Sequence, residues 1–218
     1  VFNMGGGIQK RKRFKAVQIG GPSGGCIPES LLDSPVDFES LKQAGAMMGS
    51  GSFVVVDETT CMVDMARFFL DFCAKESCGK CPPCRIGTTL MLEILNRITS
   101  GEGEERDLEV LEQMCDEVKT MSLCGLGQSA PNPVKSTIRY FRDEYMAHIR
   151  DKECPTATCV ALHRYEIVSD KCTKCLLCVK NCPVTAISGS REEEVFIHKD
   201  KCIQCNLCYE KCNFMAIK

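Results

Sequence analysis

The apolar residues between positions 61 and 150 recur at steps of three and four, which is the spacing of amphipathic helices. Four such stripes follow one another, and short polar or glycine-containing segments separate them. The stripes are Met62, Met65, Phe69, Phe72 and Cys73; Ile86, Leu90, Ile94 and Ile98; Leu108, Leu111, Cys115 and Val118; and Val134, Ile138, Phe141, Tyr145 and Ile149. Four helices with short connections predict an up-and-down four-helix bundle over residues 61–150.

The start of the fourth helix carries its own signal. Asn132 can cap the free backbone amides at the N-terminus of a helix, and Pro133 fits the first helical position, where no amide hydrogen is needed. We therefore expect this helix to begin at Pro133.

Residues 1–60 have the pattern of a β-rich region. Phe14–Ile19 alternates between apolar and polar positions, and Phe53–Val56 is a short apolar run, so both segments predict strands. We expect mostly loop between them, with a short helix near Phe38–Ala44. The glycine-rich run 20–25 is followed by Cys26-Ile27-Pro28 and no helix, which favours tight turns over a phosphate-binding loop.

Residues 168–218 contain an internal repeat of thirty residues. The segment from Asp170 to Ile187 returns as the segment from Asp200 to Ile217, with the same cysteine, leucine and alanine positions. Each half predicts a short strand, a cysteine-bearing loop and a helical turn. The few apolar residues predict that bound metal clusters stabilise this module, so the metal-free module should be largely unfolded.

Composition narrows the class of protein. The chain has 218 residues, 44% of them apolar, which is enough for packed cores and suits one or two domains. Its eighteen cysteines have metal-type spacing, and neither a signal peptide nor a membrane-spanning run accompanies them, so we expect a reducing cytoplasm. The net charge of −2 gives no reason to expect nucleic acid as a partner.

The cysteines of the repeat predict two [4Fe-4S] clusters. Each run has the spacing C-x2-C-x2-C-x3-C, in which three cysteines hold one cluster and the fourth holds the other. The first cluster would take Cys172, Cys175, Cys178 and Cys212, and the second Cys202, Cys205, Cys208 and Cys182. Zinc sites favour separated pairs of ligands, so zinc fits this spacing less well.

A third [4Fe-4S] cluster is predicted in the helical region. Its three spaced cysteines lie between the first two helices, and the fourth lies before the last helix, at the same end of an antiparallel bundle. These residues are Cys78, Cys81, Cys84 and Cys124. Zinc is the alternative at this site.

The segment between the bundle and the repeat suggests a separate zinc site. Cys154 and Cys159 lie close in sequence, with His148 before them, and Cys115 on the third helix is a fourth candidate. His163 is the alternative to His148. A disulfide between Cys154 and Cys159, or inert thiols, are the alternatives to zinc. Three further cysteines lack ligand spacing and are expected to be small buried side chains: Cys26, Cys61 and Cys73.

Two motifs carry a resemblance to a known family. The segment 76–85, Glu-Ser-Cys-Gly-x-Cys-x-Pro-Cys-Arg, followed by Ser-Leu-Cys-Gly-Leu-Gly at 122–127, resembles the cluster domain of the flavin-bearing, NADH-oxidising subunit of respiratory complex I. Residues 14–28 resemble the β-grasp, soluble-ligand-binding domain of the same subunits. With the two-cluster tail, the chain resembles the diaphorase subunit of electron-bifurcating, NAD(P)-linked iron hydrogenases and related formate dehydrogenases.

The resemblance implies an α+β multidomain chain. Its parts would be a partial β-grasp domain over 1–60, a four-helix-bundle [4Fe-4S] domain over 61–150, a linker with the zinc site over 151–167, and a two-[4Fe-4S] ferredoxin-like domain over 168–218. The family's glycine-rich loop that binds flavin and nicotinamide has no counterpart here, and the sequence begins with Val1 instead of methionine. We therefore expect a fragment whose FMN and NAD(P)H sites belong to an upstream domain.

The expected function is electron transfer. The fragment would pass single electrons between upstream FMN and partner subunits, namely a thioredoxin-like [2Fe-2S] subunit and a hydrogenase or formate dehydrogenase subunit. No catalytic residues are expected, because no nucleophile, base or paired-carboxylate motif is present. A multi-zinc interaction or nucleic-acid-binding module is the alternative, and a radical enzyme would need a C-x3-C-x2-C triplet that the chain lacks.

Overall fold

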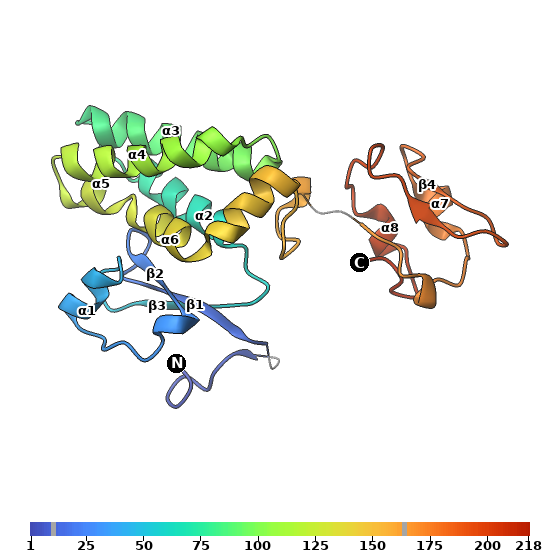
Figure 1. Ribbon diagram of the computed structural model, residues 1–218, viewed down its shortest axis with the longest axis horizontal. Helices are drawn as coiled ribbons and strands as arrows, with labels where there is room; N and C mark the ends of the chain where they lie inside the picture. The colour runs from blue at the N-terminus through green and yellow to red at the C-terminus, as the bar shows by residue number, and fades with distance from the viewer. Residues whose placement is uncertain (10–11, 163–164) are drawn as a thin grey trace. The chain divides into compact units, whose positions relative to one another are not determined.

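The computed structural model describes residues 1–9, 12–162 and 165–218, and these form two compact units (Figure 1). The first unit ends at Leu162 and contains both the strands and the long helices. The second contains the cysteine repeat. The predicted β-rich and helical regions thus pack together within a single unit.

The sheet of the first unit has three antiparallel strands in the order β2-β1-β3. They are β1 (Phe14–Ile19), β2 (Gly25–Pro28) and β3 (Phe53–Asp57), and Val17 of β1 lies opposite Ile27 of β2 and Val55 of β3. A 3-10 turn (Glu29–Leu31) and helix α1 (Phe38–Gln43) lie between β2 and β3. Both predicted strands and the predicted short helix are therefore present.

Strand β2 lies where the sequence predicted loop, and the glycines explain why. A Cβ atom on Gly25 would lie 2.4 Å from the carbonyl oxygen of Gly45, and Gly20 has a φ of +90° that turns the chain into β2. The glycine run therefore lets β2 pair with β1 while the 45–49 segment packs closely against it.

Four long helices pack around one apolar core. They are α2 (Met62–Lys75), α3 (Pro82–Ser100), α4 (Glu105–Met121) and α6 (Asn132–Met146). Helix α2 contacts α3 and α6, and α4 contacts the same two helices, so the four close a ring around side chains such as Leu70, Leu95 and Leu111. A short helix α5 (Gly125–Ser129), a π-helical turn (Ala147–Asp151) and a 3-10 turn (Val160–Leu162) complete this unit.

Some details of the helix predictions were wrong. Phe72, assigned to the apolar face of the first helix, is 45% exposed. The exposed fractions of Ile86 and Leu90 are 50% and 42%, because α3 turns Gly87, Met91 and Leu95 toward the core instead. Gly87 sets this rotation, since a Cβ there would lie 2.3 Å from Val118 Cγ2 of α4.

Asn132 is also not the cap of α6. The helix includes Asn132 and follows Pro131. The side-chain amide nitrogen of Asn132, Nδ2, donates to the carbonyl oxygen of Ser23 at 3.2 Å. Its side chain therefore ties α6 to the glycine-rich turn instead of capping its own helix.

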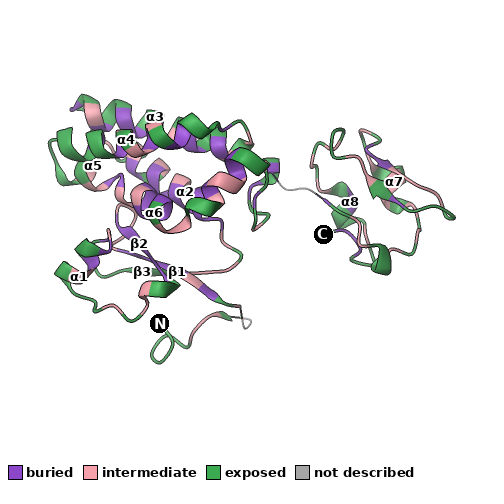
Figure 2. Cartoon of the chain, in the orientation of Figure 1, coloured by how far each residue is buried: buried purple, intermediate pink, exposed green. Residues whose placement is uncertain are grey.

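The sheet packs on helices α2 and α6. Ala16 and Cys26 share a buried cluster with Met62, Met65 and Phe69 of α2, and buried residues follow this contact in Figure 2. Polar contacts fix it as well: the Cys26 amide donates to Ser136 Oγ at 2.9 Å, and Lys15 Nζ lies 2.6 Å from Glu144 Oε1.

The second unit repeats one backbone pattern twice. Helix α7 (Leu177–Asn181) corresponds to α8 (Leu207–Glu210), and strand β4 (Ile187–Ser188) pairs antiparallel with β5 (Phe196–Ile197). Ile187 lies opposite Ile197, and thirty residues away Ile217 lies opposite Ile167. A 3-10 turn (Ser169–Lys171) precedes the first cysteine loop.

Over the described residues, none of the helices combines the length and apolar character needed to cross a bilayer.

Candidate metal centres

The backbone of the two cysteine loops supports the repeat in detail. Left-handed conformations occur at the same three positions of both halves, thirty residues apart, with φ values between 48° and 66°. These positions are Lys174, Leu176 and Thr185 in the first half and Gln204, Asn206 and Met215 in the second. Such φ values are unfavourable for residues with a Cβ. Their recurrence at equivalent positions indicates that both cysteine loops require the same backbone conformation.

One of the two predicted cysteine sets lines a single cavity. A cavity in the second unit is bordered by Cys172, Cys175, Cys178 and Cys212, which are the four residues predicted for the first cluster. Apolar side chains complete its wall, among them Leu176, Val195, Phe214 and Ile217. Three thiols from one half and one from the other thus surround one space, which is the crossed arrangement that the spacing predicts.

The other set lies beside the first. Cys182, Cys202 and Cys208 pack in the same buried group as Cys178 and Cys212. Burial raises the pKa of Cys208 to about 11, and the charges of Cys202 and Cys178 add to this effect. Equivalent amides approach the fourth cysteine of each run, since Ala186 N donates to Cys182 Sγ at 3.2 Å and Ala216 N to Cys212 Sγ at 3.3 Å. The donor set and the amide contacts fit thiolate ligands.

Three of the four predicted cluster cysteines of the first unit lie at the starts of helices, and Cys78 lies in the loop between α2 and α3. Cys81 precedes α3, Cys84 is in the first turn of α3, and Cys124 precedes α5. Hydrogen bonds from the Leu123 and Cys84 amides lower the pKa of Cys81. The 122–124 segment therefore reaches the 78–84 loop, and these backbone donors fit a thiolate that binds an iron–sulfur cluster.

A different cluster of four ligand atoms is buried in the same unit. The Sγ atoms of Cys61, Cys154 and Cys159 and a ring nitrogen of His148 all lie within 4.8 Å of one another. His148 Nε2 is 3.3 Å from Cys61 Sγ and 3.4 Å from Cys159 Sγ, and the two sulfurs are 3.8 Å apart. Three thiols and one imidazole around a common point match the donor set of a tetrahedral structural zinc site.

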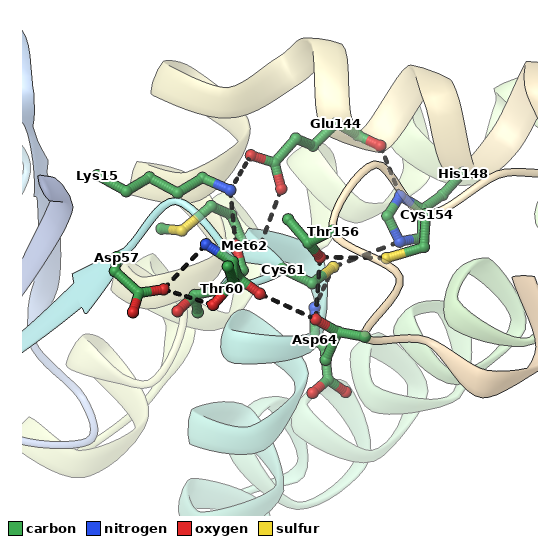
Figure 3. A network of polar contacts seen from close by, with 12 residues as sticks. Lys15, Asp57, Thr60, Cys61, Met62, Asp64, Glu144, His148, Cys154 and Thr156 are labelled. Carbon is green, nitrogen blue, oxygen red and sulfur yellow. Dashed lines mark hydrogen bonds and ion pairs between the residues drawn. The ribbon is translucent and has the colours of Figure 1, made fainter. Parts of the chain in front are cut away.

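Each ligand of this quartet comes from an element that the fold fixes. Cys61 precedes α2, His148 lies in the π-helical turn after α6, and Cys154 lies on the segment that follows (Figure 3). Cys159 lies further along the same segment. His148 Nδ1 lies 2.7 Å from the carbonyl oxygen of Glu144. That contact leaves Nε2 facing the thiols, which is the arrangement usual for a metal-binding histidine.

Glu144 connects the quartet with the sheet. Its carboxylate accepts a hydrogen bond from Met62 N at 3.0 Å and pairs with Lys15 of β1, as Figure 3 shows. Met62 follows the ligand Cys61 directly, so the same glutamate holds the start of α2 and, through its backbone, the histidine ring.

Mutual hydrogen bonds perturb the titration of the quartet. A hydrogen bond from the Cys159 thiol lowers the pKa of Cys154 strongly, and the same pairing raises that of Cys159. Burial lowers the pKa of His148, but its bonds with Cys154 and Cys61 outweigh that effect and raise the pKa to about 10. The metal-free quartet thus holds protons that a bound cation must displace.

The structure corrects the predicted zinc ligands. It brings together Cys154, Cys159 and His148 as the sequence suggested, but Cys115 is buried in the apolar core of the helices and is not part of the quartet. Cys61 takes the fourth place, although its sequence context predicted only a packing role. His163 lies outside the described residues. Cys26 and Cys73 are buried, in line with their expected packing role.

The signal for Cys61 was weak in the sequence. It lies 87 positions before His148 and has no neighbouring cysteine at ligand spacing. Its place before a helix that packs on α6 could have suggested it, because the start of α2 and the end of α6 meet when two such helices run antiparallel.

Comparisons with known proteins agree with the two-part organisation. Residues 64–148 match the family model described as the NADH-ubiquinone oxidoreductase-F iron–sulfur binding region, and residues 164–213 match a 4Fe-4S dicluster domain. The chain is 51% identical over 193 residues to the NADP-reducing hydrogenase subunit HndC of Solidesulfovibrio fructosivorans. It is 43% identical over 150 residues to the F 2 subunit of the NADH-quinone oxidoreductase of Rhizobium meliloti (strain 1021).

The alignments cover most of this chain but a minor part of each relative. They span 88% of this chain and 39% of the hydrogenase subunit, and 69% of this chain and 36% of the quinone-linked subunit. Among solved structures, an NAD+-reducing [NiFe]-hydrogenase in the H2-reduced state matches with a TM-score of 0.58 and 35% identity, over 64% of this chain and 24% of that chain.

Proposed function

This chain belongs with the F-type iron–sulfur subunits of NADH-linked oxidoreductases and fits their C-terminal part, and from that premise we propose that it relays single electrons through three [4Fe-4S] clusters. The observation that carries the proposal is the cavity bordered by Cys172, Cys175, Cys178 and Cys212, since it supports the crossed ligand set of a two-cluster module. Bound [4Fe-4S] clusters supply reversible one-electron transfer.

The twelve cluster ligands are assigned on this basis. Cys78, Cys81, Cys84 and Cys124 hold a cluster in the first unit. In the second unit Cys172, Cys175, Cys178 and Cys212 hold one cluster, and Cys202, Cys205, Cys208 and Cys182 hold the other.

The protein's own residues have three roles at these sites. The loops place the thiols, the left-handed residues such as Leu176 and Asn206 turn the backbone amides inward, and apolar side chains such as Val195 and Ile217 keep water away. Amide donors to sulfur stabilise the more negative reduced state of a cluster. Cys178 and Cys208, which belong to different ligand sets, share one apolar cluster, and this supports short-range transfer between the two clusters of the second unit.

Zinc at the quartet is part of the proposal. Three thiolates and one imidazole would bind Zn2+ tetrahedrally and join the start of α2 to the segment 154–159 that follows the helices. The role of this zinc is structural, because all four positions around the metal are taken by protein ligands and none is left for substrate.

The parent assembly follows from the family. FMN and NAD(P)H belong to a domain outside this sequence, and the partners are a thioredoxin-like [2Fe-2S] subunit and a hydrogenase or formate dehydrogenase subunit of bifurcating type, in the cytoplasm. The three-stranded sheet corresponds to part of a β-grasp domain, the four long helices to the family's bundle, and the second unit to a ferredoxin-like fold.

Metal and sulfide analysis of anaerobically prepared protein tests the proposal. We expect about twelve irons, about twelve sulfides and about one zinc per chain, with a paramagnetic resonance signal from reduced clusters. The rival multi-zinc interaction module predicts a colourless protein with several zincs and no iron. Variants of Cys175, Cys205 and Cys81 should each remove about four irons, whereas Cys26→Ala, at a buried cysteine outside the sites, should remove none.

A further inference from the structure

Ser122 carries a buried hydroxyl that has no hydrogen-bond partner. Within the described residues, the side-chain oxygens of Ser122 and Gln18 are the buried polar side-chain atoms left unpaired. Only 4% of Ser122 is exposed. A buried hydroxyl without a partner costs free energy, and native proteins rarely retain one without a role or an additional bound group.

The backbone around Ser122 is fully engaged, so only the hydroxyl is free. Ser122 N donates to the carbonyl oxygen of Val118 at 3.2 Å, and the Ser122 carbonyl oxygen accepts from Gln128 Nε2 at 3.0 Å. Helix α4 on one side and α5 on the other therefore hold this residue in place.

The hydroxyl faces the predicted cluster ligands of the first unit. A Cβ atom on Gly127 would lie 2.4 Å from Ser122 Oγ and 3.1 Å from Cys84 Cβ, so the hydroxyl and Cys84 border the same small space. Two residues after Ser122 lies Cys124, another predicted ligand. Ser122 thus lies near Cys84 and two residues before Cys124, and glycine at 127 leaves room for its side chain.

We propose that the Ser122 hydroxyl donates a hydrogen bond to a sulfur of the cluster held by Cys78, Cys81, Cys84 and Cys124, and thereby raises its reduction potential. The acceptor would be an inorganic sulfide of that cluster, because no described protein atom, Cys84 Sγ included, pairs with the hydroxyl. A donor stabilises the reduced cluster more than the oxidised one, because reduction adds negative charge to the sulfurs. Ser122 is a positioning and tuning residue, and the proposal rests on the cluster assignment made above.

Two other serines, Ser77 and Ser129, differ from Ser122 because their hydroxyls already have hydrogen-bond partners. Ser77 Oγ lies 3.3 Å from Cys84 Sγ and accepts from Gly79 N at 3.3 Å, so it already has partners. Ser129 is half-buried, lies on α5, and donates to the carbonyl oxygen of Gly125 at 2.7 Å. Ser129 is therefore a control for the loss of one hydroxyl on the helix that follows Cys124.

The test is a redox titration of the full chain, followed by paramagnetic resonance. The signal of this cluster is identified as the one that Cys81→Ala removes. In Ser122→Ala we expect the reduction equilibrium to shift threefold to tenfold toward the oxidised cluster, where tenfold corresponds to about 59 mV for one electron. Ser129→Ala should leave the midpoint unchanged, and iron content should be unchanged in both variants.

Three results would overturn the proposal: an unchanged midpoint in Ser122→Ala, an equal shift in Ser129→Ala, or a shift of the opposite sign. An unchanged midpoint would also mean that an ordered water satisfies the hydroxyl. Absence of the signal from the unmutated protein would instead overturn the cluster assignment itself, which the iron count reports separately.

A second measurement needs no change at Ser122. The protein is labelled with 13C-serine and carries Ser77→Ala, so that Ser77 no longer contributes a labelled carbon near this cluster. Pulsed paramagnetic resonance should then detect coupling between a 13C nucleus of Ser122 and the reduced cluster. Lack of that coupling would overturn the proposal even if Ser122→Ala did not assemble its cluster.

Discussion

At the scale of single residues, Cys61 combines two roles. Its sulfur accepts a hydrogen bond from Asp64 N at 3.4 Å at the start of α2, and it also lies 3.3 Å from His148 Nε2. The start of α2 and the Asp64 amide therefore fix the position of the Cys61 sulfur beside the histidine ring. A ligand held in place by its own helix needs little rearrangement to bind a metal.

Replacing Cys61 should weaken zinc binding far more than replacing another buried cysteine. For Cys61→Ala we expect zinc affinity to fall by about 100-fold or more, because one of four ligands is lost. Competition with a chromophoric chelator measures this. Cys115→Ala is the control: it should cost about 1–2 kcal/mol of stability through a small cavity and leave zinc affinity unchanged. Equal zinc affinities in the two variants would contradict the quartet.

The titration of His148 predicts how metal binding depends on pH. With a pKa of about 10 in the metal-free protein, His148 holds its proton at neutral pH and must release it when zinc binds. Raising the pH lowers the cost of that release, so apparent zinc affinity should rise between pH 6 and 8 by about tenfold per unit for each proton displaced. Calorimetry in buffers of different ionisation enthalpy counts the protons. Affinity that is flat across this range, after correction for the buffer, would be inconsistent with the protonated quartet.

At the scale of elements, the two cysteine loops depend on each other. Cys212, from the second half, borders the cavity formed by the first-half cysteines, and the repeat assigns Cys182 the equivalent place in the other site. The variant Cys182→Ala should therefore perturb the same resonance signal as Cys205→Ala, and Cys212→Ala the same signal as Cys175→Ala. The opposite grouping of the four spectra would show that each half holds its own cluster.

Sequence patterns predicted where the helices and strands lie better than they predicted which face of a helix is buried or which strands pair. The strand Phe14–Ile19 and the four long helices follow from periodicity, because local spacing of apolar residues determines which segments can bury a face. The rotation of α3 did not follow, because Gly87 allows close approach to Val118 and a glycine adds nothing to an apolar stripe. Strand β2 was missed for a similar reason, since its pairing depends on glycines that contact Gly45 across the turn.

The candidate site residues also fall into two groups: those recognisable from local sequence spacing and those that only tertiary packing brings together. Closely spaced cysteines such as Cys172, Cys175 and Cys178 are recognisable because one loop must surround one cluster. Cys61 is not, because only the antiparallel packing of α2 and α6 brings it to His148. The unpaired hydroxyl of Ser122 is likewise invisible in sequence, since burial by α4 and α5 creates it.

At the scale of the whole molecule, the two units should respond differently to loss of their metals. The first unit has a large apolar core that includes Leu70, Leu95 and Leu111, whereas the second has few buried apolar residues besides its cysteine-bearing loops. After iron is removed by a chelator, we expect amides in 165–218 to exchange hydrogen nearly freely and those of the long helices to stay protected. Hydrogen exchange with mass spectrometry reads both units in one sample. Protection retained in 165–218 after complete removal of iron would contradict this dependence.

The matched left-handed positions in the two halves, from Lys174 and Gln204 to Thr185 and Met215, have a consequence for how such a module can arise and change. If the proposed crossed assignment holds, neither half supplies all four ligands of one cluster, so an ancestral peptide of half this length would have needed a second copy of itself to hold a cluster in this way. Duplication and fusion would have turned that pair into one chain, in which each copy must keep three cysteines for its own cluster and one for the cluster of the other copy.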